Sequence, residues 1–217
     1  MRLSRSDTMQ RRQFLAGSLG AILLSGCRKT TKLAGIRSGQ TVLAFGDSVT
    51  FGTGAASGEG WPTLLAQKTG WNVVNAGISG DTAKNGKNRV SALLDAHRPA
   101  LVIIEIGGND FLRRQPSSVV KEDIRQIIQA VRRAGAVVAL VAVPELSLLG
   151  IVAGKPSDSP IFEELADEER VPLIARVFSE TLGRPELCAD RIHPNARGYQ
   201  HMANGFHARL KEIGLAV

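Results

Sequence analysis

The chain has 217 residues, of which 43% are hydrophobic and 22% charged, and this composition suits one globular domain with a substantial core. Four arginines and one aspartate within residues 1–26 account for +3 of its net charge of +7. The remaining Lys and Arg residues are scattered, and only one tyrosine accompanies them, so the composition argues against a nucleic-acid-binding protein. A solvated basic surface fits this charge better than one that faces anionic lipid.

Residues 1–26 have the pattern of an export signal. The pair Arg11-Arg12 precedes an uncharged apolar stretch over residues 16–25, which is too short to span a bilayer comfortably. The paired arginines resemble a twin-arginine signal, although Gln10 and Ala16 depart from that motif. We therefore expect an exported protein located in a bacterial periplasm.

The end of this signal resembles a bacterial lipobox, Leu24-Ser25-Gly26-Cys27. It predicts that Cys27 is lipidated, becomes the mature N-terminus and anchors the protein to a membrane. The alternatives are a simple cleaved signal that ends near a cysteine, and a disulfide between Cys27 and Cys188, the only other cysteine. Residues 27–39 are expected to form a polar tether, and residues 40–217 the folded domain.

Apolar segments with strand character alternate with helical segments along this domain. The expected strands cover residues 40–45, 71–76, 100–106, 136–143 and 171–175. The expected helices cover residues 61–69, 81–97, 117–134, 161–169 and 194–213, with a long loop over 145–160 and an irregular stretch over 178–191. Glu105 is the one charged residue in its apolar strand, and we expect it to be structural. This alternation predicts a three-layer α/β/α sandwich with a five-stranded parallel sheet of order 2-1-3-4-5.

A candidate nucleophile follows the first strand, in Gly46-Asp47-Ser48. Ser48 lies where a strand passes into a helix, and ligands bind at the carboxyl ends of strands in such sheets. The alternative is an ordinary turn in which Asp47 caps the helix. Gly80 and Asn109 follow the second and third strands by a few residues, so both are expected near Ser48.

The chain has four histidines, and their positions favour His193 as the base. His97 precedes a strand and belongs at the opposite edge of the sheet, whereas His201 and His207 lie within the last helix. Asp190 stands three residues before His193, close enough to bond its Nδ1 and leave Nε2 for the serine proton. The alternatives are a helix cap for Asp190 and a surface position for His193.

Acyl transfer also needs donors directed at the developing oxyanion. The backbone N–H groups of Ser48 and Gly80 and the side-chain amide of Asn109 would supply three; alternatively, Asn109 satisfies its own turn. Phe111 and Leu112, together with the loop over 145–160, are candidates for an acyl-binding wall or, equally, packing residues. No His, Cys, Asp or Glu cluster has metal-ligand spacing, and we expect neither metal nor cofactor.

Four segments together resemble the four sequence blocks of the SGNH, or GDSL, hydrolase family, in the family's order. They are Gly46-Asp47-Ser48, Gly77-Ile78-Ser79-Gly80-Asp81, Gly107-Gly108-Asn109-Asp110 and Asp190-Arg191-Ile192-His193-Pro194. The subgroup that they resemble most contains bacterial arylesterases, lysophospholipases and thioesterase I. The resemblance implies Ser48 as nucleophile, Asp190 and His193 as acid and base, and Ser48, Gly80 and Asn109 as oxyanion donors.

This resemblance implies a serine esterase that acts on aryl esters, lysophospholipids or thioesters through an acyl-serine. We expect the protein to be a monomer. One alternative is a carbohydrate or peptidoglycan O-acetylesterase of the same family, and another is a non-catalytic lipoprotein that binds acyl ligands. Val49 replaces the leucine that is frequent in the first block, and Arg191 stands where a small or apolar residue is commoner. Arg191 either favours anionic substrates or points to solvent.

Overall fold

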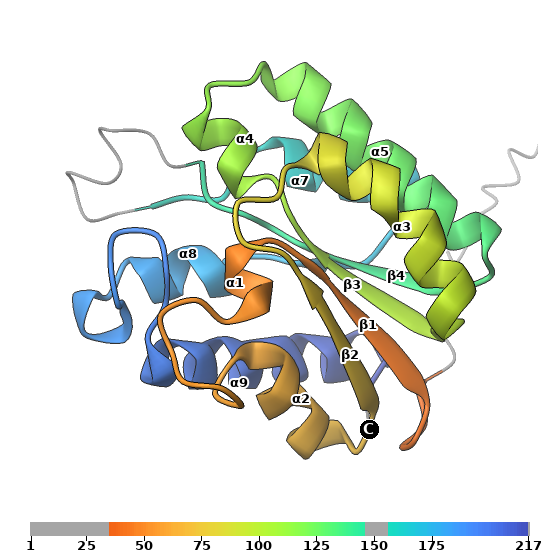
Figure 1. Ribbon diagram of the computed structural model, residues 1–217, viewed down its shortest axis with the longest axis horizontal. Helices are drawn as coiled ribbons and strands as arrows, with labels where there is room; N and C mark the ends of the chain where they lie inside the picture. Colours follow the sequence, from red (N-terminus) through yellow and green to blue (C-terminus); the bar gives the residue numbers. More distant parts are fainter. Residues whose placement is uncertain (1–34, 146–155, 217) are drawn as a thin grey trace, which may run out of the picture. The chain divides into compact units, whose positions relative to one another are not determined.

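The computed structural model describes residues 35–145 and 156–216, which form a sheet between two layers of helices (Figure 1). The five parallel strands have the order β2-β1-β3-β4-β5, which confirms the predicted topology. The strands are β1 (Thr41–Gly46), β2 (Asn72–Gly77), β3 (Leu101–Glu105), β4 (Val137–Val141) and β5 (Leu173–Ile174). The prediction for the last strand was too long, because only two residues of β5 pair with β4.

Five longer helices cover the sheet. They are α2 (Trp61–Thr69), α3 (Ala83–His97), α5 (Ser117–Arg133), α7 (Ile161–Glu169) and α9 (Ala196–Glu212). In Figure 1, α3, α5 and α7 lie on one side of the sheet, and α2 and α9 pack together on the other. The apolar stripe of α5 is buried against the core, as its helical spacing requires.

Short helices correct two expectations from the sequence. The stretch over 178–191 is not wholly irregular, since it includes most of α8 (Val177–Leu182) and a 3₁₀ turn at Pro185–Leu187. A further helix, α4 (Gly108–Leu112), follows β3 where none was expected. The last helix begins at Ala196 rather than Pro194 and is capped by Asn195. His193 therefore lies in the loop before that helix, where its backbone is not helical.

The register of the central strands aligns their carboxyl ends. Gly46 pairs with Gly77 of β2 and with Glu105 of β3. The segments that leave these three strands consequently start at the same level of one sheet edge. This is the edge at which open α/β sheets bind ligands.

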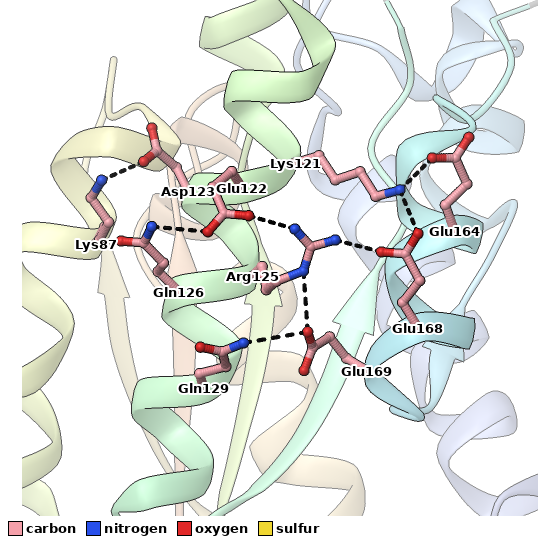
Figure 2. Close-up of polar contacts among 10 residues, drawn as sticks. All are labelled: Lys87, Lys121, Glu122, Asp123, Arg125, Gln126, Gln129, Glu164, Glu168 and Glu169. Atoms are coloured by element: carbon pink, nitrogen blue, oxygen red, sulfur yellow. Dashed lines mark hydrogen bonds and ion pairs between the residues drawn. The ribbon is translucent and has the colours of Figure 1, made fainter.

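An ion-pair network joins α5 to α7 on the outer surface (Figure 2). Arg125 lies between Glu122, Glu168 and Glu169, and Lys121 contacts Glu164 and Glu168. Lys87 of α3 pairs separately with Asp123 of α5. These contacts lie along helices that cover one face of the sheet.

Several expectations fall outside the described residues. They are the export signal over 1–26, Cys27, most of the tether, and residues 146–155 of the long loop. Within the ranges that the structure describes, no helix is long and apolar enough to cross a membrane.

Candidate active site

The turn from β1 into α1 (Ser48–Phe51) presents Ser48. Asp47 caps this helix, because its Oδ1 accepts the N–H of Val49 at 3.0 Å. Ser48 is the first helical residue, and its own N–H has no acceptor among the described residues, as expected at a helix N-terminus. Gly46 is required because a Cβ there would overlap the Thr50 side chain and the Glu105 carbonyl. The nucleophile segment thus packs directly onto β3.

Ser48, His193 and Asp190 form a connected chain of hydrogen bonds. The Oγ of Ser48 lies 2.9 Å from Nε2 of His193, and Nδ1 of His193 lies 2.8 Å from Oδ2 of Asp190. The second carboxylate oxygen of Asp190 accepts the N–H groups of Ile192 and His193, both at 2.8 Å. Burial raises the pKa of Asp190, but these three hydrogen bonds outweigh it and the net pKa is lowered. A charged Asp190 fixes the Nδ1–H tautomer and directs Nε2 at Ser48.

Long-range packing brings the histidine loop to the serine. The Tyr199 hydroxyl donates to the carbonyl of Thr53 at 2.6 Å, which ties α9 to the loop after α1. A Cβ at Gly54 would overlap the Pro194 carbonyl and the Ala189 side chain. These contacts hold together two loops that lie about 140 residues apart in the chain. Local sequence sets only the shape of each loop.

The other histidines lie elsewhere, as the sequence predicts. His97 ends α3 at the opposite edge of the sheet. In α9, Nδ1 of His201 lies 2.9 Å from the Thr181 hydroxyl, and the Nε2 of His207 is buried without a partner among the described residues. His193 is therefore the histidine that faces Ser48.

The three expected oxyanion donors occupy different surroundings. The amide of Asn109 donates to the Asp81 carbonyl at 2.9 Å and to Oδ2 of Asp47 at 3.2 Å. Asn109 is thus bound to two neighbouring loops and does not merely satisfy its own turn. Gly80 has a positive φ of 80°, and its N–H donates to no atom of the described residues. Both N–H groups, of Ser48 and Gly80, remain available to a ligand.

A cavity that opens to solvent adjoins Ser48, Asn109 and His193. Its apolar lining comes from Val49, Leu112, Val143, Pro144, Phe178 and Ile192. Leu112 lines this cavity, whereas the Phe111 ring packs edge-on against that of Phe162, with 6.4 Å between the ring centres, and is absent from the lining. Gly80 is not in the lining either, but the adjacent residue Asp81 holds Asn109 through its carbonyl.

Sequence reasoning did not identify Phe178 and Ile192 as lining residues. Phe178 begins the stretch that the sequence assigns to irregular structure, and Ile192 belongs to the Asp190–Pro194 segment around the histidine. The available signal was the apolar pair Val177-Phe178 directly after the fifth strand, because residues after a parallel strand reach the same sheet edge. Pro144, which directly precedes the long loop over 145–160, lines the cavity, but no described residue of that loop does. The contribution expected of 146–155 lies outside the described residues.

Buried carboxyl groups lie behind the nucleophile. Burial raises the pKa of Asp47 to about 6, against an ordinary value of 3.8. The hydrogen bond from the Val49 N–H and the charge of the His193 ring oppose this shift. Glu105 is fully buried, and its Oε2 accepts the Thr50 hydroxyl at 2.7 Å. Burial raises the pKa of Glu105 well above its usual range, and the nearby carboxylate of Asp47 raises it further. Over the described ranges, no group of three His, Cys, Asp or Glu side chains could hold a metal ion.

Known proteins resemble this chain in sequence and in fold. Residues 44–201 match the GDSL-like Lipase/Acylhydrolase family. Esterase TesA of Pseudomonas aeruginosa is 35% identical over 203 residues, which cover 89% of this chain and 98% of that protein. Thioesterase 1/protease 1/lysophospholipase L1 of Escherichia coli K12 is 35% identical over 80% of this chain and 84% of its own length. The crystal structure of TesA superposes with a TM-score of 0.71 at 31% identity, covering 80% of this chain and 99% of that one.

Proposed function

Because the chain belongs to the GDSL-like lipase/acylhydrolase family and is a GDSL-type serine esterase, we propose that it hydrolyses aryl esters, lysophospholipids or thioesters through an acyl-Ser48 intermediate. The observation that carries the proposal is the 2.9 Å approach of Ser48 Oγ to His193 Nε2, with Asp190 at 2.8 Å from the other ring nitrogen. A nucleophile bonded to a base, which is in turn oriented by a third group, is the arrangement that acyl transfer needs.

In the first proposed step, His193 Nε2 takes the proton from Ser48 Oγ as that oxygen attacks the substrate carbonyl. The resulting tetrahedral oxyanion collapses, and His193 returns the proton to the departing alcohol, phenol or thiol. In the second step, water attacks the acyl-serine, His193 accepts the water proton, and Ser48 recovers it as the acid leaves. Asp190 stays ionised throughout, in keeping with its lowered pKa, and stabilises the imidazolium.

The proposed oxyanion site combines the two free N–H groups of Ser48 and Gly80 with the Asn109 amide. Both N–H groups of this amide are already used, toward Asp81 and Asp47. The contact with Asp47 is the longer, at 3.2 Å, so the oxyanion would take over that proton. Loss of one such donor lowers kcat about 10²- to 10³-fold in other enzymes.

The cavity supports an apolar acyl group, because its walls near Ser48 are mostly apolar. Relatives whose names include esterase, thioesterase and lysophospholipase indicate the ester classes to test. Arg191 is exposed beside the cavity residue Ile192, where it would meet an anionic leaving group such as a phosphate.

The decisive experiment compares Ser48→Ala with Ser79→Ala. Ser79 lies at the same sheet edge, and its hydroxyl is 3.2 Å from that of Thr53 rather than from a histidine. We expect Ser48→Ala to lower kcat on short aryl esters by about 10⁶-fold, as for removal of other serine nucleophiles, and to abolish fluorophosphonate labelling. Ser79→Ala should retain both. Activity retained in Ser48→Ala would disprove the proposal.

The natural ester is assigned by the acyl-length profile of the same enzyme. Acetyl, butyryl and octanoyl esters are compared at matched leaving groups, and a lysophospholipid is assayed beside them. A rate that falls steadily beyond acetyl, with activity on acetylated glycans, would assign an O-acetylesterase instead. Failure of a fluorophosphonate to label the folded protein would favour a non-catalytic acyl-binding role.

We also propose that the protein is exported and anchored through lipid on Cys27. The support is the Leu24-Ser25-Gly26-Cys27 motif after a short apolar stretch. Cell fractionation and mass spectrometry of the mature N-terminus test it, with Cys27→Ala as the comparison. Equal membrane association of both forms, without lipid on the wild type, would contradict the anchor.

A further inference from the structure

One arginine connects the segments that carry the proposed oxyanion donors. Arg89 lies in α3, and its side chain is 20% exposed. Its Nε donates to Oδ2 of Asp81 at 2.7 Å, and its two terminal nitrogens donate to the carbonyls of Ala76 and Gly46, both at 2.9 Å. Each nitrogen of the guanidinium group is therefore assigned to a different acceptor.

These acceptors stand next to the three donors. Gly46 is two residues before Ser48, and its carbonyl also accepts the N–H of Ile78 at 3.2 Å, in the loop that leads to Gly80. Asp81 follows Gly80 directly, and its own carbonyl accepts the Asn109 amide at 2.9 Å. A shift of Arg89 would consequently reach all three donor groups at once.

The guanidinium group itself is held in place. It lies 4.2 Å from the centre of the Phe45 ring, a buried side chain of β1. A Cβ at Gly86, one helical turn earlier, would press on Phe45 and Ile106, so α3 packs closely on the sheet at this point. A planar group stacked on a ring, with donors in a fixed fork, has little freedom to move.

We propose that Arg89 is the positioning residue of the oxyanion site, which it holds in shape by its three hydrogen bonds. This inference rests on the proposed function. Arg89 does not line the cavity beside Ser48, so it acts through Gly46, Asp81 and the loop between β2 and α3. Lysine cannot replace it, because one ammonium group lacks the fork that reaches three separated acceptors.

The test measures Arg89→Gln and Arg89→Lys, with Lys87→Gln as the matched control. Lys87 lies on the same helix, and its ammonium group pairs with Asp123 of α5 rather than with the segments that carry the donors. Exhaustive fluorophosphonate labelling counts the active sites, and kcat and KM are measured per labelled site. The Ki is measured for a short alkyl trifluoromethyl ketone, which forms a tetrahedral oxyanion on serine. We expect kcat to fall and Ki to rise by about 10²-fold for both Arg89 variants, the scale of a misplacement of about 1 Å.

KM should change little, because ground-state binding in the cavity does not depend on Arg89. A purely structural role would lower the number of labelled sites and leave kcat and Ki per site equal to those of Lys87→Gln, which would overturn the inference. Full recovery in Arg89→Lys would overturn it as well, since charge alone would then suffice. Either result leaves the proposed function intact, whereas activity in Ser48→Ala would remove both.

Discussion

Two regions of the molecule gather charged side chains, and they differ in burial. The network between α5 and α7 places Arg125 and Lys121 among four glutamates on the outer surface (Figure 2). Behind Ser48, by contrast, Asp47, Asp81 and Glu105 are at most 5% exposed. Only Asp81 among these three has a cationic partner, Arg89.

The difference shows that the number of ion pairs does not indicate where the chemistry lies. Exposed pairs contribute little, because water and salt screen them and both side chains lose freedom. Buried carboxyl groups with few partners have shifted pKa values, and such groups gather at functional sites. In this chain the sparsely paired carboxyls lie at the carboxyl edge of the sheet, beside the candidate nucleophile.

The largest expected effect separates two carboxylates of similar exposure. The side chains of Asp190 and Glu168 are 54% and 48% exposed. We expect Asp190→Asn to lower kcat by about 10²- to 10⁴-fold, because the amide no longer stabilises the Nδ1–H tautomer and the imidazolium of His193. Glu168→Gln should leave kcat unchanged. Equal kcat values for both variants on an aryl ester would show that the contact between Asp190 and His193 does not contribute to catalysis.

A second prediction concerns the pH dependence of stability. Because burial raises the pKa of Asp47 to about 6 from 3.8, the folded protein loses stability as pH rises through about 6, where a buried charge appears. Asp47→Asn avoids that charge and keeps an oxygen for the N–H of Val49, while its amide nitrogen replaces the Oδ2 that accepts the Asn109 amide, a loss that does not change with pH. Between about pH 4 and pH 7.5, the variant should therefore gain up to about 3 kcal/mol in free energy of unfolding relative to wild type.

Urea unfolding at several pH values measures this difference, and Asp190→Asn serves as its control. Since the pKa of Asp190 is lowered, its carboxylate stabilises the fold above its ordinary pKa, and that contribution is lost as pH falls through the lowered value. The stability of Asp190→Asn relative to wild type should thus change with pH only below the ordinary Asp pKa of 3.8, whereas that of Asp47→Asn changes above it and with the opposite sign. Parallel slopes would contradict the contrast between the two carboxylates.

The smallest expected effect lies in the outer network. Arg125→Gln removes contacts with Glu122, Glu168 and Glu169, yet exposed pairs of this kind contribute about 0.2–1 kcal/mol. We expect a loss of stability below about 1 kcal/mol, reduced further at about 1 M salt, and no change in kcat. Thermal and urea unfolding at low and high salt measure it. A larger loss of unfolding free energy that does not depend on salt would show that water and ions do not screen these pairs, as in a buried ion-pair network.

Residues close together in the chain could be predicted well. Asp190 and His193 meet because three residues span one turn, and the aspartate also accepts the loop's own N–H groups. The apolar runs of β1 and β3 correspond to buried strands, since both faces of a parallel sheet are covered. The fifth strand could be predicted but its short length could not, and α4 was missed, because the ends of such elements depend on packing rather than on breaker residues.

The sequence by itself determined the alternation of strands and helices, because apolar periodicity and glycine or proline boundaries are local properties. The predicted order β2-β1-β3-β4-β5 is one of those that such alternating chains adopt, and the structure has it. The sequence also determined which histidine could face Ser48. Only the tertiary structure decided that Phe178 rather than Phe111 lines the cavity, that Asn109 bonds both Asp47 and Asp81, and that Arg89 joins the donor segments. These contacts depend on the register that aligns Gly46, Gly77 and Glu105, and on burial, which appear only when distant segments pack together.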